Sequence, residues 1–491
     1  MLICSICFIV FVFALCRYVP AFRLPNSSKW TISIGLLIKI IVGFFYLYLY
    51  TYHYGAGSLS SDSNAYMQDS KLLNEVFYKS PKAYFQFVFG LDDRQLLMDY
   101  LSETTHWDSR NFFNDTKNII RLHSFIHFFS FNQVVVHLTV VVFIALMGLR
   151  LIVVTLSNYV KLSPTLIFYS LLLMPNLLFW TSGILKEPLI LFSFGLLFYS
   201  LLGQLPRIKK GILFLLSLVL FAGIKPYLLL CILPAIFVYI LFNRIRSFWL
   251  ALGTLIIGVV LITLSFLTPF TQPLVNKISD QQFDFINIGR GGVFARADTC
   301  VYIIYGENMP YVVVNEKDST VFVTKQVIGH YIQPYRKKDK KVCQIYPNEK
   351  PWKLYYDGEF CGSYIEINPI EQSGMQLIRN IPEALNNVFF RPFPHDPPHT
   401  KTKWITIIDS WGLLLIFLFV SLFFRRSLER PYWNIIVALI VFCIVLALLI
   451  GWTTPVLGAI VRYKLPIQLA MMIMTLIMFN PEKIKKWKNT F

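Results

Sequence analysis

The chain has 491 residues, of which 56% are hydrophobic and 16% aromatic, and its mean hydropathy is +0.57. These values exclude a water-soluble globular protein, because so much apolar surface needs lipid or neighbouring helices around it. The formal net charge of +18 does not indicate nucleic acid as a partner, because the basic residues lie beside apolar segments and form no compact basic domain.

Apolar segments along the chain predict an all-α polytopic membrane bundle of about eleven transmembrane helices. Two lie in residues 1–50, six in 133–268 and three in 404–491, where a basic tail follows. The expected spans are 2–16, 30–50, 133–156, 165–180, 188–203, 211–224, 227–242, 247–268, 404–424, 431–450 and 465–479. The first segment has no basic residue before it and no cleavage pattern after it, so we expect a retained span.

Loops that alternate in register with these spans carry basic residues on one side. By the positive-inside rule that side is cytoplasmic, which places the N-terminus outside, the C-terminus inside and both long loops outside. The basic residues are Arg17, Arg23, Lys29, Arg207, Lys209, Lys210, Arg244, Arg246, Arg425, Arg426, Arg430, Lys483, Lys485, Lys486 and Lys488.

Two long polar segments interrupt the hydrophobic pattern. Residues 51–132 have apolar residues at irregular helical spacing, which predicts short helices along the membrane surface. Residues 269–403 contain alternating runs with turn residues between them, which predicts a small α/β or mostly β extracytoplasmic domain.

Three of the eight cysteines, Cys300, Cys343 and Cys361, lie in the second polar segment. An oxidising compartment would allow one disulfide among them, and the spacing does not choose the pair. It also matches no zinc pattern. The cofactor is unknown, with a divalent metal possible.

Asp62 lies in a polar, turn-forming run just beyond the second span. A base acting on a lipid-linked substrate would have to sit there. The alternative is that Asp62 caps a helix beginning near Asn64.

In the segment 175–188, Lys186 and Glu187 lie at a membrane edge, where charges by default mark a functional site. The alternative is a mutually neutralised pair that anchors the helix end.

Lys225, Arg391 and Arg462 lie on the outer side, against the positive-inside bias. Arg by bidentate contact and Lys as a point charge could bind the phosphate of a polyprenyl-linked donor. Snorkelling to lipid head groups is the alternative for each. Lys39, inside the second span, is expected to stabilise the bundle.

Four short stretches carry a family resemblance: Asp62-Ser63 with Tyr66, the Phe179-to-Glu187 turn, Phe390-Arg391-Pro392, and Arg462-Tyr463-Lys464. The chain resembles bacterial membrane proteins related to the GT-C glycosyltransferase superfamily. The resemblance implies transfer of a sugar from a polyprenyl-phosphate donor, with inversion, to a glycan, lipid or protein acceptor at the outer face of the bacterial inner membrane.

On this resemblance Asp62 is the first-loop carboxylate that activates the acceptor or binds a metal, and Glu187 is the second acid. Lys186, Lys225, Arg391 and Arg462 would hold the donor phosphate. The paired acids usual in the family are replaced by Ser61-Asp62-Ser63.

Two aromatic residues and a histidine complete the expected substrate contacts. Tyr66 belongs to the first stretch. His106 with Trp107 suits stacking against a sugar, and the alternative is that Trp107 lies at the membrane interface.

Two other functions remain open. One is an O-antigen-type oligosaccharide polymerase or ligase, which would use Arg and His in the outer loops. The other is a transporter or non-catalytic component of a glycan-export system, which would predict repeated halves.

Overall fold

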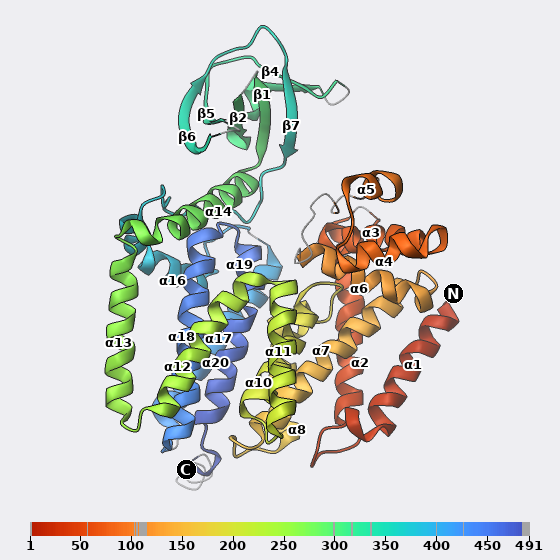
Figure 1. Cartoon of the computed structure of the whole chain (residues 1–491), viewed down its shortest axis with the longest axis vertical. Coiled ribbons are helices and arrows are strands. Elements are labelled where there is room, and N and C mark those ends of the chain that lie inside the picture. Colours follow the sequence, from red (N-terminus) through yellow and green to blue (C-terminus); the bar gives the residue numbers. More distant parts are fainter. Residues whose placement is uncertain are drawn as a thin grey trace. The chain divides into compact units, whose positions relative to one another are not determined.

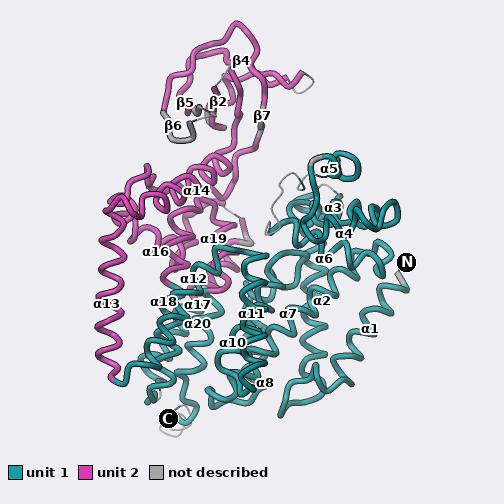
Figure 2. The backbone as a smooth tube through the Cα atoms, in the orientation of Figure 1, with its two compact units in different colours: residues 1–246, 413–443, 467–491 teal, residues 247–412, 444–466 magenta. Residues whose placement is uncertain are grey.

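The computed structural model describes all residues except 1, 56, 103, 105–106, 108–114, 298–299, 316–317, 334–335, 399, 426 and 484–491. It divides into two compact units, drawn in different colours in Figure 2. Unit 1 comprises residues 1–246, 413–443 and 467–491, and unit 2 comprises residues 247–412 and 444–466.

The described part of unit 1 is helical, and most of its helices are labelled in Figure 1. Twelve helices lie wholly within it, and parts of α17 (Lys401–Phe423), α18 (Arg430–Thr453) and α20 (Leu465–Met478) join them. The twelve are α1 (Leu2–Tyr18), α2 (Thr31–Tyr48), α3 (Ser61–Lys79), α4 (Pro81–Phe89), α5 (Arg94–Tyr100), α6 (Asp115–Ser130), α7 (Val134–Leu156), α8 (Pro164–Leu172), α9 (Pro175–Trp180), α10 (Glu187–Leu202), α11 (Arg207–Ile224) and α12 (Pro226–Arg244).

Among the described residues, six helices are long and apolar enough to cross a membrane, and a seventh is counted if α19 (Leu457–Tyr463) and α20, bent by 44°, form one span. The chain is therefore a multi-pass membrane protein. The six are Thr31–His53, Val134–Leu156, Pro226–Arg244, Phe248–Ser265, Lys403–Phe423 and Arg430–Thr453.

The other expected spans fall short for identifiable reasons. Pro175 divides the segment 165–180 into α8 with nine residues and α9 with six, because the residue before a proline disfavours helical geometry. The first segment and the segment 188–203 form apolar helices of 17 and 16 residues. Helix α11 begins with Arg207, Lys209 and Lys210, so its apolar part is short.

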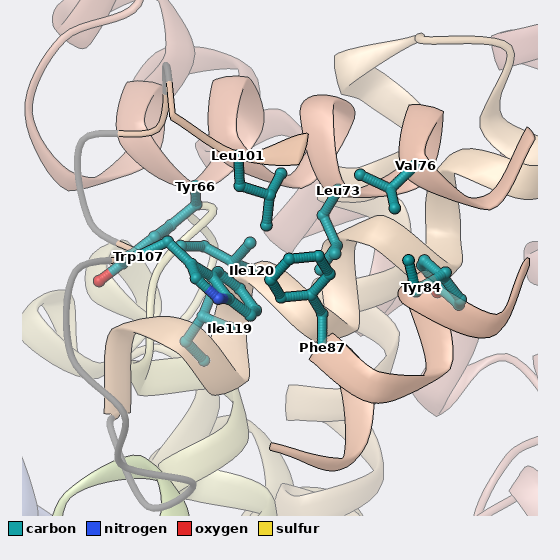
Figure 3. Close-up of a cluster of buried hydrophobic side chains, with 10 residues drawn as sticks. Tyr66, Leu73, Val76, Tyr84, Phe87, Leu101, Trp107, Ile119 and Ile120 are labelled. Carbon is teal, nitrogen blue, oxygen red and sulfur yellow. The ribbon is translucent and has the colours of Figure 1, made fainter. Parts of the chain in front are cut away.

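Helices α3 to α6, which make up most of the first polar segment, pack on one another around a hydrophobic cluster (Figure 3). Short helices along the membrane surface were expected here. Helices α4 and α5 are short, with nine and seven residues, whereas α3 and α6 have 19 and 16. Local signals set the ends of α4. Ser80 caps α4 by accepting a hydrogen bond from the Ala83 N–H, and Gly90 ends α4 with φ 69°. The cluster consists of Tyr66, Leu73, Val76, Ala83, Tyr84, Phe87, Leu101, Trp107, Ile119 and Ile120.

Three buried histidines connect α6 with α7 and α3. The Nδ1 atoms of His123 and His137 lie 2.9 Å apart, and His137 Nε2 lies 2.9 Å from Ser130 Oγ. His127 Nε2 lies 3.2 Å from Ser70 Oγ on α3. Burial, with a smaller effect of His127, lowers the pKa of His123 to about 3, so this residue is neutral at physiological pH. The three histidines therefore link α6 to α7 and α3 through hydrogen-bond contacts, in which His123 is uncharged.

Unit 2 contains a seven-stranded antiparallel sheet with the order β3-β4-β7-β1-β2-β5-β6. This confirms the mostly β region expected in the second polar segment. Alternate residues, such as Val293 and Ala295 on β1, are buried on one face, as period-two patterning requires. The strands are β1 (Gly292–Ala297), β2 (Cys300–Tyr305), β3 (Val312–Asn315), β4 (Thr320–Val323), β5 (Val327–Gln333), β6 (Arg336–Ile345) and β7 (Trp352–Gly358).

Helices of unit 2 precede and follow the sheet in the chain, and parts of α17, α18 and α20 belong to this unit as well. Those wholly within it are α13 (Phe248–Ser265), α14 (Gln272–Arg290), α15 (Gly374–Arg379), α16 (Ile381–Phe389) and α19.

All eight cysteines are free thiols, so the disulfide considered among Cys300, Cys343 and Cys361 is not formed. For Cys300 and Cys343 the sheet gives the reason. Cys300 lies on β2 and Cys343 on β6, and β5 lies between them. Two strand spacings amount to about 9.6 Å, which exceeds the Cα separation that a disulfide tolerates.

Candidate functional site

The turn between α9 and α10 carries Lys186 and rests on α2. Lys39 Nζ donates hydrogen bonds to Thr181 Oγ1 at 2.6 Å and to Ser182 Oγ at 3.1 Å. At Gly43 the backbones approach so closely that a Cβ would lie 2.7 Å from the Ser182 carbonyl oxygen. Lys39 therefore stabilises the bundle, as expected, and it does so by holding this turn.

Helix α3 contacts the same turn through its first residues. Tyr46 Oη on α2 lies 2.7 Å from Ser63 Oγ, which donates a hydrogen bond to the Ile184 carbonyl at 2.9 Å. Ser60 is the N-cap of α3, and Asp62 lies in the first turn, where the helix dipole favours a negative charge. The sequence-based alternative, in which Asp62 caps a helix beginning near Asn64, does not match this geometry, because the helix begins at Ser61.

Asp62 lies one helical turn before Tyr66, and Tyr66 is an α3 residue that Lys186 approaches. Asp62 is half-buried, and Tyr66 follows it by one helical turn, so both residues share a face. Lys186 Nζ lies 5.9 Å from the Tyr66 ring centroid. Lys186 therefore lies beside the turn of α3 that follows Asp62.

Lys186 and Glu187 are each paired with a residue from another element. Lys186 Nζ lies 2.7 Å from Asp115 Oδ2 and 3.2 Å from Thr116 Oγ1, both at the start of α6. Lys225 Nζ, between α11 and α12, lies 3.1 Å from Glu187 Oε1. The alternative considered above, in which Lys186 and Glu187 neutralise each other, is therefore wrong. We call Asp62, Asp115, Lys186, Glu187 and Lys225 the polar junction.

The two pairs differ in exposure. The side chains of Glu187 and Lys225 are 2% and 8% exposed, whereas Asp115 is 39% exposed and Lys186 11%. A buried ion pair depends on both partners, because either charge alone would be left without compensation. The Lys186–Asp115 pair is open to solvent on the Asp115 side, so Lys186 is the cation of the junction that an anionic ligand can reach with the least rearrangement.

A further group of charges lies beside the polar junction at the start of α6. Asp92 Oδ2 lies 3.8 Å from Lys117 Nζ and accepts a hydrogen bond from Trp107 Nε1 at 3.2 Å. The Arg121 guanidinium lies 5.3 Å from the Trp107 ring centroid. Burial lowers the pKa of Arg121, and the nearby Asp92 opposes that shift.

The aromatic residues expected to contact the sugar are enclosed by protein. Trp107 is 1% exposed and Tyr66 2%, and Figure 3 shows both among the packed side chains of the cluster. Their burial favours a structural role, since neither ring offers a free face for stacking. His106 lies outside the described residues.

Arg391 and Arg462 belong to unit 2, and each is described there. Arg391 follows α16, and its Nη1 lies 3.4 Å from Asp396 Oδ1. Its carbonyl accepts a hydrogen bond from Lys464 Nζ at 2.7 Å. Arg462 lies, half-buried, in the last turn of α19.

Sequence reasoning missed Asp115, Lys117 and Arg121, which form most of the ion pairs and cation contacts of α6. The polar run 115–118 before the apolar residues 119 and 120 indicates a helix start, and the four-residue spacing of Lys117 and Arg121 places these two on one face. What the sequence could not supply is the partner of each charge.

The described residues contain no group of three or more His, Cys, Asp or Glu side chains arranged to hold a metal ion. The polar junction instead offers the half-buried carboxylate of Asp62, the ammonium of Lys186 and the buried Glu187–Lys225 ion pair.

Comparison of the chain with protein-family models, with curated proteins and with solved structures finds no match.

Proposed function

We propose that the protein is an integral membrane glycosyltransferase of the GT-C kind, which transfers a sugar from a polyprenyl-phosphate donor to an envelope acceptor at the outer face of the bacterial inner membrane. The observation that supports the proposal is the position of Asp62 one helical turn before Tyr66, whose ring centroid lies 5.9 Å from Lys186 Nζ. An inverting transfer needs a base and a cation near the departing phosphate.

In the proposed reaction the Asp62 carboxylate takes the proton from an acceptor hydroxyl. The oxygen then forms a bond to the anomeric carbon as the bond from that carbon to the phosphate oxygen breaks. The phosphate leaves with the electron pair, and Lys186 stabilises its negative charge while Asp115 holds the ammonium in place. Glu187 serves to position Lys225, because its carboxylate is buried against that ammonium.

The test replaces Asp62 with Asn in cells that lack the native copy, followed by gel and mass-spectrometric analysis of envelope glycans. We expect loss of the glycan at normal membrane abundance of the variant. The matched control is Glu75→Gln on the same helix, whose carboxylate is 45% exposed and 4.0 Å from Lys71. A normal glycan profile from Asp62→Asn would contradict the proposed base.

An O-antigen-type polymerase or ligase is the second candidate. The burial of Glu187 in its pair with Lys225 favours it, because a reaction that depends on cations needs no second free acid. This function predicts that Lys186→Met abolishes the product whereas Asp62→Asn retains it. The glycosyltransferase predicts that both variants lose it.

A further inference from the structure

Three arginines of unit 1 lie together where the link between α1 and α2 meets α7 (Figure 1). Arg23, in the link, donates hydrogen bonds from Nε to the Arg17 carbonyl at 2.9 Å and from Nη2 to the Tyr18 carbonyl at 2.6 Å. Arg150 on α7 donates from Nε to the Arg23 carbonyl at 2.6 Å. All three side chains are half-buried. We call Arg17, Arg23 and Arg150 the arginine cluster.

The elements that form the arginine cluster carry no acidic residue. Residues 1–61, which contain α1 and α2, and residues 116–186, which contain α7 and α8, include no Asp or Glu. Helix α10 also packs on α7, but it approaches Arg150 with Tyr199, about three helical turns beyond its one acid, Glu187. The hydrogen-bond acceptors of the cluster are neutral carbonyl oxygens, so three like charges lie close together without a carboxylate from these elements to offset them.

The surroundings of Arg17 are those of a binding residue. Its guanidinium carbon lies 4.0 Å from the Trp30 ring centroid and 5.5 Å from the Tyr18 ring centroid. Its Nε is buried and has no hydrogen-bond partner among the described residues. Stacking on a ring covers a face of the planar guanidinium and leaves the N–H groups at its edge for bidentate contact with an anion. Arg17 is therefore a donor that lacks an acceptor.

We propose that the arginine cluster binds the head group of an anionic phospholipid, in the leaflet that the positive-inside rule makes cytoplasmic. Phosphate oxygens accept paired hydrogen bonds from guanidinium, and a negative head group offsets the charge of the cluster. Within the described part of the chain Arg150 donates only from Nε, which leaves both of its Nη groups for the ligand. The site goes beyond the proposed function, which concerns the opposite face, and does not depend on it.

Apolar side chains lead from the arginine cluster into the membrane, which favours a lipid over free phosphate. The span containing α2 begins at Thr31, directly after Trp30, so later residues of α2 lie deeper. The link joins α1 to α2 at this end, so on α1 the deeper residues precede Arg17, and the Phe13 ring lies 6.2 Å from the Trp30 ring. Exposed residues at helical spacing continue both faces inward: Ile34, Leu37 and Ile41 on α2, and Val10 and Ile6 on α1.

The test uses the delipidated full chain in a non-ionic detergent, with binding constants measured by native mass spectrometry. The probes are dioleoyl phosphatidylglycerol, dioleoyl phosphatidylcholine, which has the same chains and no net charge, and glycerol 3-phosphate, which has no chains. Arg17→Gln removes a charge and breaks no side-chain hydrogen bond of the described residues, and Arg150→Gln removes a second charge. The matched control is Arg207→Gln, at an exposed position in the first turn of α11.

We expect phosphatidylglycerol to bind Arg17→Gln and Arg150→Gln roughly tenfold more weakly than wild type, and to bind Arg207→Gln normally. An equal loss in Arg207→Gln would overturn the site, because basic charge anywhere on this side would then suffice. Phosphatidylcholine binding as tightly as phosphatidylglycerol would overturn the anion, and glycerol 3-phosphate binding as tightly would overturn the lipid. Melting temperatures without ligand show whether each variant folds. Should Arg150→Gln fail to fold, unchanged binding by Arg17→Gln would still contradict the proposal.

Discussion

Glu187 and Lys186 are neighbours in sequence and have different partners in space. At a helix start, adjacent side chains point in different directions, so Lys186 reaches Asp115 while Glu187 reaches Lys225. The consequence is that three separate parts of unit 1, the α9–α10 turn, the start of α6 and the α11–α12 link, are held together by charge.

Breaking the Glu187–Lys225 pair should destabilise the protein strongly. We expect Glu187→Gln or Lys225→Met to lower the free energy of unfolding by about 3 kcal/mol or more, because each removes one charge of a buried ion pair. The double variant should lose much less than the sum of the two. Unfolding in detergent by denaturant titration, arranged as a double-mutant cycle, measures the coupling.

The matched control for this cycle is the pair Lys71–Glu75 on α3, whose side chains are 54% and 45% exposed. Solvent screens such a pair, so its coupling should stay below about 0.5 kcal/mol. Equal coupling free energies in the two cycles would mean that burial does not strengthen the Glu187–Lys225 ion pair.

At the scale of helices, capping residues and prolines in the sequence are sufficient to predict where some helices begin. Ser80 and Pro81 begin α4, and Pro175 begins α9. Hydropathy alone could not distinguish a spanning helix from a short apolar one. The segment 165–180 looks continuous in hydropathy and is broken in three dimensions, because backbone geometry at Met174–Pro175 outweighs its apolar composition.

Helices α7 and α10 touch through two glycines, and this contact should tolerate no larger residue. A Cβ on Gly148 would lie 2.5 Å from the Phe192 Cα, and one on Gly195 would lie 2.4 Å from the Gly148 carbonyl oxygen. We expect Gly148→Val to lower the free energy of unfolding by about 1–3 kcal/mol through overpacking. The measurement is the same denaturant titration in detergent.

Gly253→Val on α13 is the control, because a Cβ there meets nothing within 4 Å. It makes the same change of residue in another apolar helix, so it separates the helix contact from the intrinsic effect of replacing glycine. If both variants lower the free energy of unfolding by a similar amount, the effect of Gly148→Val does not come from the α7–α10 contact.

For the whole molecule, the sequence predicted a multi-pass membrane protein and a β region between residues 269 and 403, and both are present. Hydropathy and alternation indicate whether a segment faces lipid or water, so they predict the membrane class and the β region, but they predict more spans than the six or seven found among the described residues. They carry no information about partners distant in the chain. Lys186 and Asp115 are 71 positions apart, and Arg150 meets Arg23 only through packing, so neither contact could be read from the sequence.

The distribution of basic residues predicts the orientation of the chain in the membrane. In a cysteine-free background, we expect Lys350→Cys, an exposed position before β7, to react with a membrane-impermeant maleimide added to intact cells. Lys209→Cys, exposed in the first turn of α11, should react only after the membrane is disrupted, because basic loops stay cytoplasmic. Labelling is detected by gel shift in intact cells and after membrane disruption, and the second measurement shows that each cysteine can react. Labelling of Lys209→Cys in intact cells would reverse the orientation, and the polar junction could then not act on the outer face.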